Sequence, residues 1–163
     1  MRTIDEYPPG LIGTLTELFG RAIAASHGVD WTVDAMIAEQ QCQLFRQFDP
    51  SCDRVWVALE GGSPHGALTI DGPRPEMGRH AARLRFFILD ESLRGLGPGR
   101  LMMSHAIEFC RERGYRRISL TTLHGLDAAM RLYESYGFTQ VGQSAATFHG
   151  SRSVELTLEP ELA

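Results

Sequence analysis

A chain of 163 residues with 43% hydrophobic and 22% charged residues has the length and composition of one globular domain, spanning residues 1–163. The formal net charge of −4, from 16 Lys and Arg against 20 Asp and Glu, argues against sequence-independent nucleic-acid binding, which needs a basic face. No apolar run approaches the ~20 residues that cross a bilayer and the N-terminus lacks a signal-peptide core, so we expect a cytoplasmic protein without membrane contacts.

The first third of the chain has the pattern of a short strand followed by two helices. Residues 2–7 (RTIDEY) are a candidate strand, which ends at Pro8-Pro9-Gly10. Apolar residues at a period of 3.6 then predict a helix from Leu11 to His27. A second helix is predicted from Val33 to Phe48, with Thr32 as its possible N-cap.

The middle of the chain changes to the period of two that is typical of strands. Residues 54–60 (RVWVALE), a GGS turn and residues 65–71 (HGALTID) predict a β-hairpin. Residues 72–80 form a polar loop, and residues 81–89 (AARLRFFIL) predict a longer strand.

The rest of the chain predicts five further elements after a glycine-rich turn. They are a helix over about 98–113 capped by Gly114, a strand over 116–122, a short helix around 129–136 ended by Gly137, and two strands near 138–148 and 151–158. The resulting order, β-α-α-β-β-β-α-β-α-β-β, predicts an α/β domain with a mixed sheet.

The three cysteines, Cys42, Cys52 and Cys110, are far apart in the sequence. They match neither a disulfide framework nor a metal-binding pattern, so we expect free thiols and no bound metal.

The glycine-rich turn, RGLGPGR over residues 94–100, follows the predicted strand over 81–89 and leads into the predicted helix over about 98–113. A helix N-terminus offers unpaired N–H groups and partial positive charge, so an anion fits there, although a plain connecting turn is the alternative. Two phosphate-binding patterns fail: no lysine follows Gly99, as the P-loop requires, and the third glycine comes one residue too early for a dinucleotide fingerprint.

A third pattern fits. Residues 94–99 (RGLGPG) match R/Q-x-x-G-x-G/A, the pyrophosphate-binding signature of the GNAT family of N-acetyltransferases, and residues 128–138 (AAMRLYESYGF) resemble that family's A-x-x-L-Y-E-x-x-G-F motif. The order of elements also agrees from end to end. Residues 110–138 are most similar to the acetyltransferase half of winged-helix repressor–acetyltransferase fusions; the winged-helix half is missing from this sequence, and whether a regulatory partner replaces it is open.

The resemblance implies a GNAT fold, with a mixed sheet of about seven strands flanked by about four helices. It implies direct transfer of an acetyl group from acetyl-CoA to a primary amine. In the family the strand before the turn splays from its neighbour, so its backbone binds the pantetheine arm, with the Ile88 N–H as the expected donor to the acetyl oxygen. The resemblance assigns cofactor binding to Phe87, Ile88, Leu89, Arg94, Gly95, Leu96, Gly97, Gly99 and Arg100.

Tyr133 aligns with the family tyrosine that protonates the leaving thiolate, so the resemblance implies that it is the general acid. A phenol with a pKa near 10 is a suitable proton donor. The alternative is a packed aromatic, because Tyr133 also lies on the apolar stripe of its helix with Ala129 and Leu132.

The general base is left open between Glu76, His80, His124 and ordered water. Relatives often carry a glutamate on the central strand, where this chain has Arg83 and Arg85.

The acceptor, a small-molecule or peptide amine, is expected to meet the first two helices, the 72–80 loop and the last hairpin. Trp31, Glu39 and Phe148 are candidate contacts, and a homodimer is possible. Two other functions stay open: a non-catalytic acyl-CoA-binding sensory module, and a nucleotide-binding enzyme.

Overall fold

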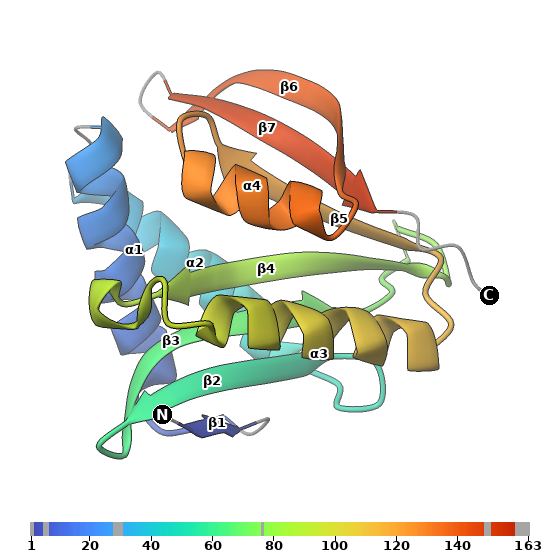
Figure 1. Ribbon diagram of the computed structural model, residues 1–163, viewed down its shortest axis with the longest axis horizontal. Helices are drawn as coiled ribbons and strands as arrows, with labels where there is room; N and C mark the ends of the chain where they lie inside the picture. Colours follow the sequence, from blue (N-terminus) through green and yellow to red (C-terminus); the bar gives the residue numbers. More distant parts are fainter. Residues whose placement is uncertain (1, 5–6, 28–30, 76, 149–150, 159–163) are drawn as a thin grey trace.

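A seven-stranded sheet forms the centre of the computed structural model, which describes all residues except 1, 5–6, 28–30, 76, 149–150 and 159–163 (Figure 1). The strand order is β1-β2-β3-β4-β5-β7-β6. The elements are β1 (Arg2–Ile4), α1 (Leu11–His27), α2 (Thr32–Arg46), β2 (Arg54–Glu60), β3 (Ser63–Asp71), β4 (Ala81–Leu89), the 3-10 turn η1 (Glu91–Leu93), α3 (Pro98–Glu112), β5 (Arg117–Leu123), α4 (Asp127–Ser135), β6 (Thr139–Phe148) and β7 (Ser151–Leu158).

The predicted order of strands and helices is confirmed. Two expectations about α2 are wrong. The helix ends at Arg46 rather than near Phe48, and its N-cap is Trp31, which makes no side-chain capping hydrogen bond, so Thr32 is already the first helical residue.

Two glycines end helices as the sequence predicted. Gly114 after α3 and Gly137 after α4 have φ values of 72° and 88°. The following N–H groups reach back to the helices, from Tyr115 to the Cys110 carbonyl at 2.9 Å and from Phe138 to the Tyr133 carbonyl at 3.2 Å. This pattern is a Schellman motif, which fixes where each chain turn leaves its helix.

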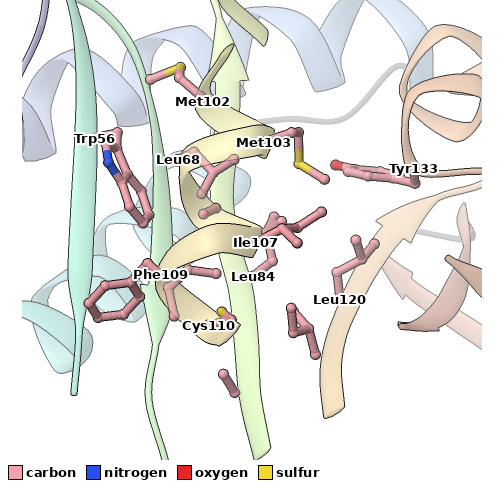
Figure 2. Close-up of a cluster of buried hydrophobic side chains, with 14 of the residues drawn as sticks. Trp56, Leu68, Leu84, Met102, Met103, Ile107, Phe109, Cys110, Leu120 and Tyr133 are labelled. Atoms are coloured by element: carbon pink, nitrogen blue, oxygen red, sulfur yellow. The ribbon is translucent and has the colours of Figure 1, made fainter. Parts of the chain in front are cut away.

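The helices cover the sheet in two layers, with α3 and α4 on one face and α1 and α2 on the other (Figure 1). The core on the α3 face contains Trp56, Leu68, Met103, Ile107 and Leu120 (Figure 2). A second core on the other face packs Leu11, Leu15, Val55, Val57 and Ile88. No helix in the described ranges is both long and apolar enough to cross a membrane.

Strand β4 changes the face that its side chains occupy at a bulge. Ala82 and Leu84 belong to the core on the α3 face, whereas Phe86 and Ile88 belong to the core on the α1 face. The register between β3 and β4 is irregular there, and Phe86 has a φ of 50°, an uncommon value for a residue with a side chain. Beyond the bulge, Phe87 therefore projects towards α3 and α4.

The two parallel strands in the centre of the sheet separate along their length. β4 pairs with β5 at Ala81↔Arg117, Ala82↔Ile118 and Arg83↔Ser119, and residues 84–89 have no partner on β5. Figure 1 shows the strands moving apart towards the end of β4 that leads into the glycine-rich turn. This is the splay that the family resemblance predicted, and we call it the β4–β5 opening.

Candidate active site

The glycine-rich turn passes directly from the β4–β5 opening into α3. Gly97 is the N-cap of α3, and Pro98 occupies the first helical turn, as expected. The first helical hydrogen bond runs from the Leu101 N–H to the Gly97 carbonyl at 3.1 Å. Because the N–H of a residue at this place has no helical acceptor, proline costs the helix nothing here.

Five backbone N–H groups of the turn have no acceptor among the described residues, those of Gly95, Leu96, Gly97, Gly99 and Arg100. Gly95 and Gly97 have φ values of 76° and 99°, which glycine adopts without strain. A Cβ at either position would meet no atom within 4 Å, so the turn is open to a ligand. Free N–H groups beside the positive end of α3 form a site suited to a phosphate group.

Two arginines flank these N–H groups. The Arg94 Nε donates to the Leu89 carbonyl at 3.2 Å, and its Nη1 lies 3.5 Å from the Glu91 carboxylate. The Arg100 side chain has no ion pair with any residue that the structure describes. Both side chains are exposed at the mouth of the turn, so they add positive charge where an anion would sit.

A hydrogen bond connects α4 to the first turn of α3. The Tyr136 hydroxyl donates to the Arg100 carbonyl at 2.7 Å and lies 2.9 Å from the Ser104 Oγ. This contact holds the helix that carries Tyr133 against the helix that begins at the glycine-rich turn.

The backbone of β4 presents alternate groups to the β4–β5 opening. Ile88 pairs with Ala67 on β3. Two residues further along, the Asp90 N–H donates to the His65 carbonyl of β3 at 2.8 Å. Bonded pairs alternate in an antiparallel ladder, so the Ile88 N–H and carbonyl face β3. A Cβ placed on Gly66 would indeed meet the Ile88 carbonyl oxygen.

The expectation that the Ile88 N–H donates to the acetyl oxygen is therefore wrong for this register. In a trans peptide the N–H and carbonyl point in opposite directions, so the Phe87 carbonyl and the Leu89 N–H and carbonyl face the opening. The Leu89 carbonyl already accepts from Arg94. The sequence located the strand, but the register decided which of its groups are available.

Tyr133 lies on the buried face of α4, and its side chain is only 5% exposed. Its ring centroid is 6.3 Å from that of Phe87 and 5.9 Å from that of Phe138. Figure 2 shows its hydroxyl pointing towards Met103 of α3. The hydroxyl has no hydrogen-bond partner within the described ranges, and burial raises the pKa of Tyr133 above its ordinary value. Tyr133 is therefore a packed core aromatic that also carries an uncommitted proton.

The candidate bases lie in different places. The His80 Nδ1 is 3.2 Å from the Gly114 carbonyl, at the C-terminal end of α3. The 15 residues of α3 span about 22 Å, so His80 is remote from the glycine-rich turn. His124 is exposed in the turn between β5 and α4, at the open end of the splay. Glu76 lies outside the described residues.

Two of the three candidate acceptor contacts belong to α2, and the third belongs to β6. Trp31 is 76% exposed at the start of α2, and Glu39 accepts a long hydrogen bond of 3.5 Å from Gln43 on the helix surface. Phe148 ends β6, and its side chain lies outside the described part of the structure.

A buried ionic network joins β2, β3 and β4, and sequence reasoning missed it. Arg74 lies 2.8 Å from carboxylate oxygens of both Asp53 and Asp71, and Arg85 lies 3.6 Å from Asp71 and donates to Gln40 of α2 at 3.3 Å. Burial raises the pKa of Asp71, and the guanidinium groups of Arg74 and Arg85 oppose that rise. Only Asp71 and Arg74 are close in the sequence, and Asp53 and Arg85 come from other segments, so no local spacing indicates the whole network.

The structure describes no cluster of three or more His, Cys, Asp and Glu side chains that could hold a metal ion. Its three cysteines are free thiols, with Cys110 buried and Cys42 and Cys52 half-buried.

The sequence is similar to those of curated N-acetyltransferases. Human N-acetyltransferase 8B is 36% identical over 122 residues, which cover 70% of this chain and 52% of the human protein. The chain spans about half or less of the length of the curated relatives it matches.

Solved structures share the fold at low sequence identity. A ribosomal-protein-alanine N-acetyltransferase from Brucella melitensis has a TM-score of 0.71 at 20% identity, over 98% of this chain and 100% of that one. A GCN5-related N-acetyltransferase from Kribbella flavida has a TM-score of 0.71 at 21% identity, over 98% of this chain and 97% of that one. The model of the acetyltransferase (GNAT) family matches residues 19–138, and the chain therefore belongs to the GNAT acetyltransferase family.

Proposed function

We propose that the protein is an acetyl-CoA-dependent N-acetyltransferase that moves an acetyl group directly to a primary amine. The observation that carries the proposal is that two features adjoin: five N–H groups around the start of α3 that have no acceptor among the described residues, and an edge of β4 that no longer pairs with β5. The N–H groups suit a pyrophosphate, and the β4 edge suits an extended arm that carries amide groups. Membership of the GNAT family supports the same assignment.

The pyrophosphate of CoA would lie on the N–H groups of Gly95, Leu96, Gly97, Gly99 and Arg100, with the guanidinium groups of Arg94 and Arg100 beside it. Pro98 removes one donor from this set without disturbing α3. Along β4, the Leu89 N–H and the Phe87 carbonyl would bond the pantetheine arm as a neighbouring strand does. The side chains of Phe87, Ile88 and Leu89 hold that strand in the two cores.

When bound, acetyl-CoA supplies an acyl group on a good leaving group. The chain's own contribution is to orient the two reactants and to manage protons. Tyr133 donates its proton to the departing sulfur, and its hydroxyl has no hydrogen-bond partner among the described residues. Burial raises the pKa of Tyr133, which keeps the phenol protonated at neutral pH but makes it a weaker acid, so the transfer depends on the negative charge that develops on the sulfur. General acid catalysis of this kind contributes about 10²–10⁴-fold to the rate.

The attacking amine must be neutral, so a base or ordered water takes its proton. We favour His124 or water over His80, because the His80 ring lies at the far end of α3. The acceptor is a small-molecule or peptide amine.

We further propose that the protein is cytoplasmic, with one domain over residues 1–163 and no membrane or nucleic-acid partner. We also propose that it can form a homodimer and that it is related to the acetyltransferase half of winged-helix repressor–acetyltransferase fusions.

Two measurements test this proposal. Isothermal titration with acetyl-CoA, CoA and ATP should show tight binding of the first two and weak binding of ATP. Release of free CoA should then follow with at least one of a panel of polyamines, amino acids, aminoglycosides and peptide N-termini. Binding without turnover on any amine would favour a non-catalytic acyl-CoA sensor, and failure of CoA to bind would overturn the proposal.

A further inference from the structure

One tyrosine makes the polar contact between α3 and the end of α4. The Tyr136 hydroxyl donates to the Arg100 carbonyl at 2.7 Å and lies 2.9 Å from the Ser104 Oγ. Because Tyr136 uses its single hydroxyl proton on the carbonyl, Ser104 is the donor to the Tyr136 oxygen. Within the part of the chain that the structure describes, these two hydrogen bonds are the ones that join α3 to α4 and its C-cap.

Tyr136 and Tyr133 belong to the same rigid turn. Tyr136 is the C-cap of α4, and its N–H donates to the Tyr133 carbonyl at 3.0 Å. The Phe138 N–H donates to the same carbonyl at 3.2 Å, as part of the Schellman motif that ends the helix. A displacement of Tyr136 relative to α3 therefore displaces Tyr133 as well.

The other partner of Tyr136 belongs to the proposed pyrophosphate site. Arg100 lies in the first turn of α3, and its N–H is one of the five without an acceptor among the described residues. The adjacent Gly99 is close to both β4 and α4, because a Cβ there would lie 3.5 Å from the Phe87 ring and 3.7 Å from the Leu132 side chain. The first turn of α3 is therefore the point where the glycine-rich turn, β4 and α4 meet.

The two helices differ in how firmly the core holds them. α3 has buried residues along its length, from Pro98 to Cys110. α4 has nine residues, all of them described, and only Tyr133 among them is buried. Burial of apolar surface is the main force that fixes a helix on a sheet, so α4 relies more on its hydrogen bonds to α3 than α3 does on α4. Loss of the Tyr136 hydroxyl should therefore shift α4 and leave α3 in place.

We propose that Tyr136 is a positioning residue, whose hydroxyl holds α4 on the first turn of α3 and so keeps the Tyr133 hydroxyl within reach of the β4–β5 opening. The inference rests on the proposed acetyltransferase function and adds a residue on which its general acid depends. Tyr133 supplies the proton, and Tyr136 sets the position of that proton. Proton transfer requires the donor within hydrogen-bond reach of its acceptor, so a small shift of α4 lowers the rate.

Tyr136→Phe keeps the ring and removes the hydroxyl. We expect kcat for CoA release to fall about tenfold or more, because misplacement of a catalytic group by about 1 Å can cost about 10²-fold. The Kd for acetyl-CoA should stay within about twofold, because α3 and the glycine-rich turn remain in place. Tyr115→Phe is the matched control, because the Tyr115 hydroxyl also donates to a backbone carbonyl, that of Cys52 at 2.8 Å, beyond the other end of α3. It should lower stability in urea and retain the wild-type kcat.

A double-mutant cycle separates positioning from a general loss of stability. In the Tyr133→Phe background no phenolic proton remains to be positioned, so adding Tyr136→Phe should change kcat by less than about twofold. A purely structural role would multiply the two losses. Multiplied losses, or a wild-type kcat in Tyr136→Phe alone, would overturn the proposal.

Hydrogen exchange tests the anchoring of α4 without turnover. The amides of α4 should exchange about fivefold faster in Tyr136→Phe than in the wild type or Tyr115→Phe, the value of one net hydrogen bond. Unchanged exchange in α4 would show that Tyr136 does not hold the helix, and would overturn the proposal even if acetyl transfer occurs. Failure of the proposed function would instead be seen as absence of acetyl-CoA binding by the wild-type protein.

Discussion

Replacing Gly97 with alanine tests the pyrophosphate site most directly. Gly97 has φ 99° and ψ −15°, a left-handed conformation that costs a residue with a Cβ about 1–2 kcal/mol. The N–H groups of Gly95, Leu96, Gly97, Gly99 and Arg100 have no acceptor among the described residues, so this part of the turn can relax in the free protein and must regain its shape on binding. The cost of the left-handed conformation is then included in the binding free energy and weakens binding. We expect the Kd for CoA, measured by titration calorimetry, to rise about 5- to 30-fold.

Gly114→Ala is the matched control. Gly114 also has a positive φ, 72°, and no atom near a new Cβ, but hydrogen bonds of the Schellman motif hold it after α3. Its strain should therefore lower the free energy of unfolding in urea by a similar ~1–2 kcal/mol and leave Kd for CoA within about twofold. The reasoning is refuted if Gly97→Ala binds CoA like the wild type, or if both variants weaken binding equally.

Three further predictions concern the buried groups. Tyr133→Phe should lower kcat by about 10²–10⁴-fold with little change in the Kd for acetyl-CoA; normal kcat would remove Tyr133 as the acid. Burial raises the pKa of Tyr133 in the folded state above the ordinary tyrosine value of about 10, so its contribution to stability is complete below pH 10 and is lost as pH rises further. Above pH 10, the free energy of unfolding measured in urea should therefore fall with pH less steeply in Tyr133→Phe than in the wild type, by up to about 1.4 kcal/mol per pH unit. Equal pH slopes in the two proteins would contradict this. Arg74→Met should cost about 3–5 kcal/mol in urea unfolding because it leaves the buried Asp53 carboxylate without its ion pair, whereas a loss below about 1 kcal/mol would show that the network is unimportant.

Several features of the fold followed from local sequence signals. The boundaries of β2 and β4 agree with prediction, because each is a short run rich in apolar residues that lies between polar or glycine residues. The ends of α3 and α4 were predictable for a similar reason, since glycine after a helix adopts the left-handed conformation readily.

The predictions failed where local signals were weak or competed. Thr32 is a good capping residue, but the chain enters α2 one residue earlier, at Trp31. The sequence also gave no warning of the network of Asp53, Asp71, Arg74 and Arg85, because contacts between separate segments leave no periodic pattern.

By itself, the sequence determined the family, the order of elements and the strand–turn–helix around residues 94–100, because glycine spacing and hydrophobic period act over short distances. Only the tertiary structure decided which β4 groups face the β4–β5 opening. That outcome depends on the bulge at Phe86 and on the pairing of β4 with β3. Together they direct the Ile88 N–H towards β3 and the Leu89 N–H towards the β4–β5 opening. The tertiary structure also brought the Tyr136 hydroxyl to the first turn of α3, because the packing of α4 joins residues far apart in the chain.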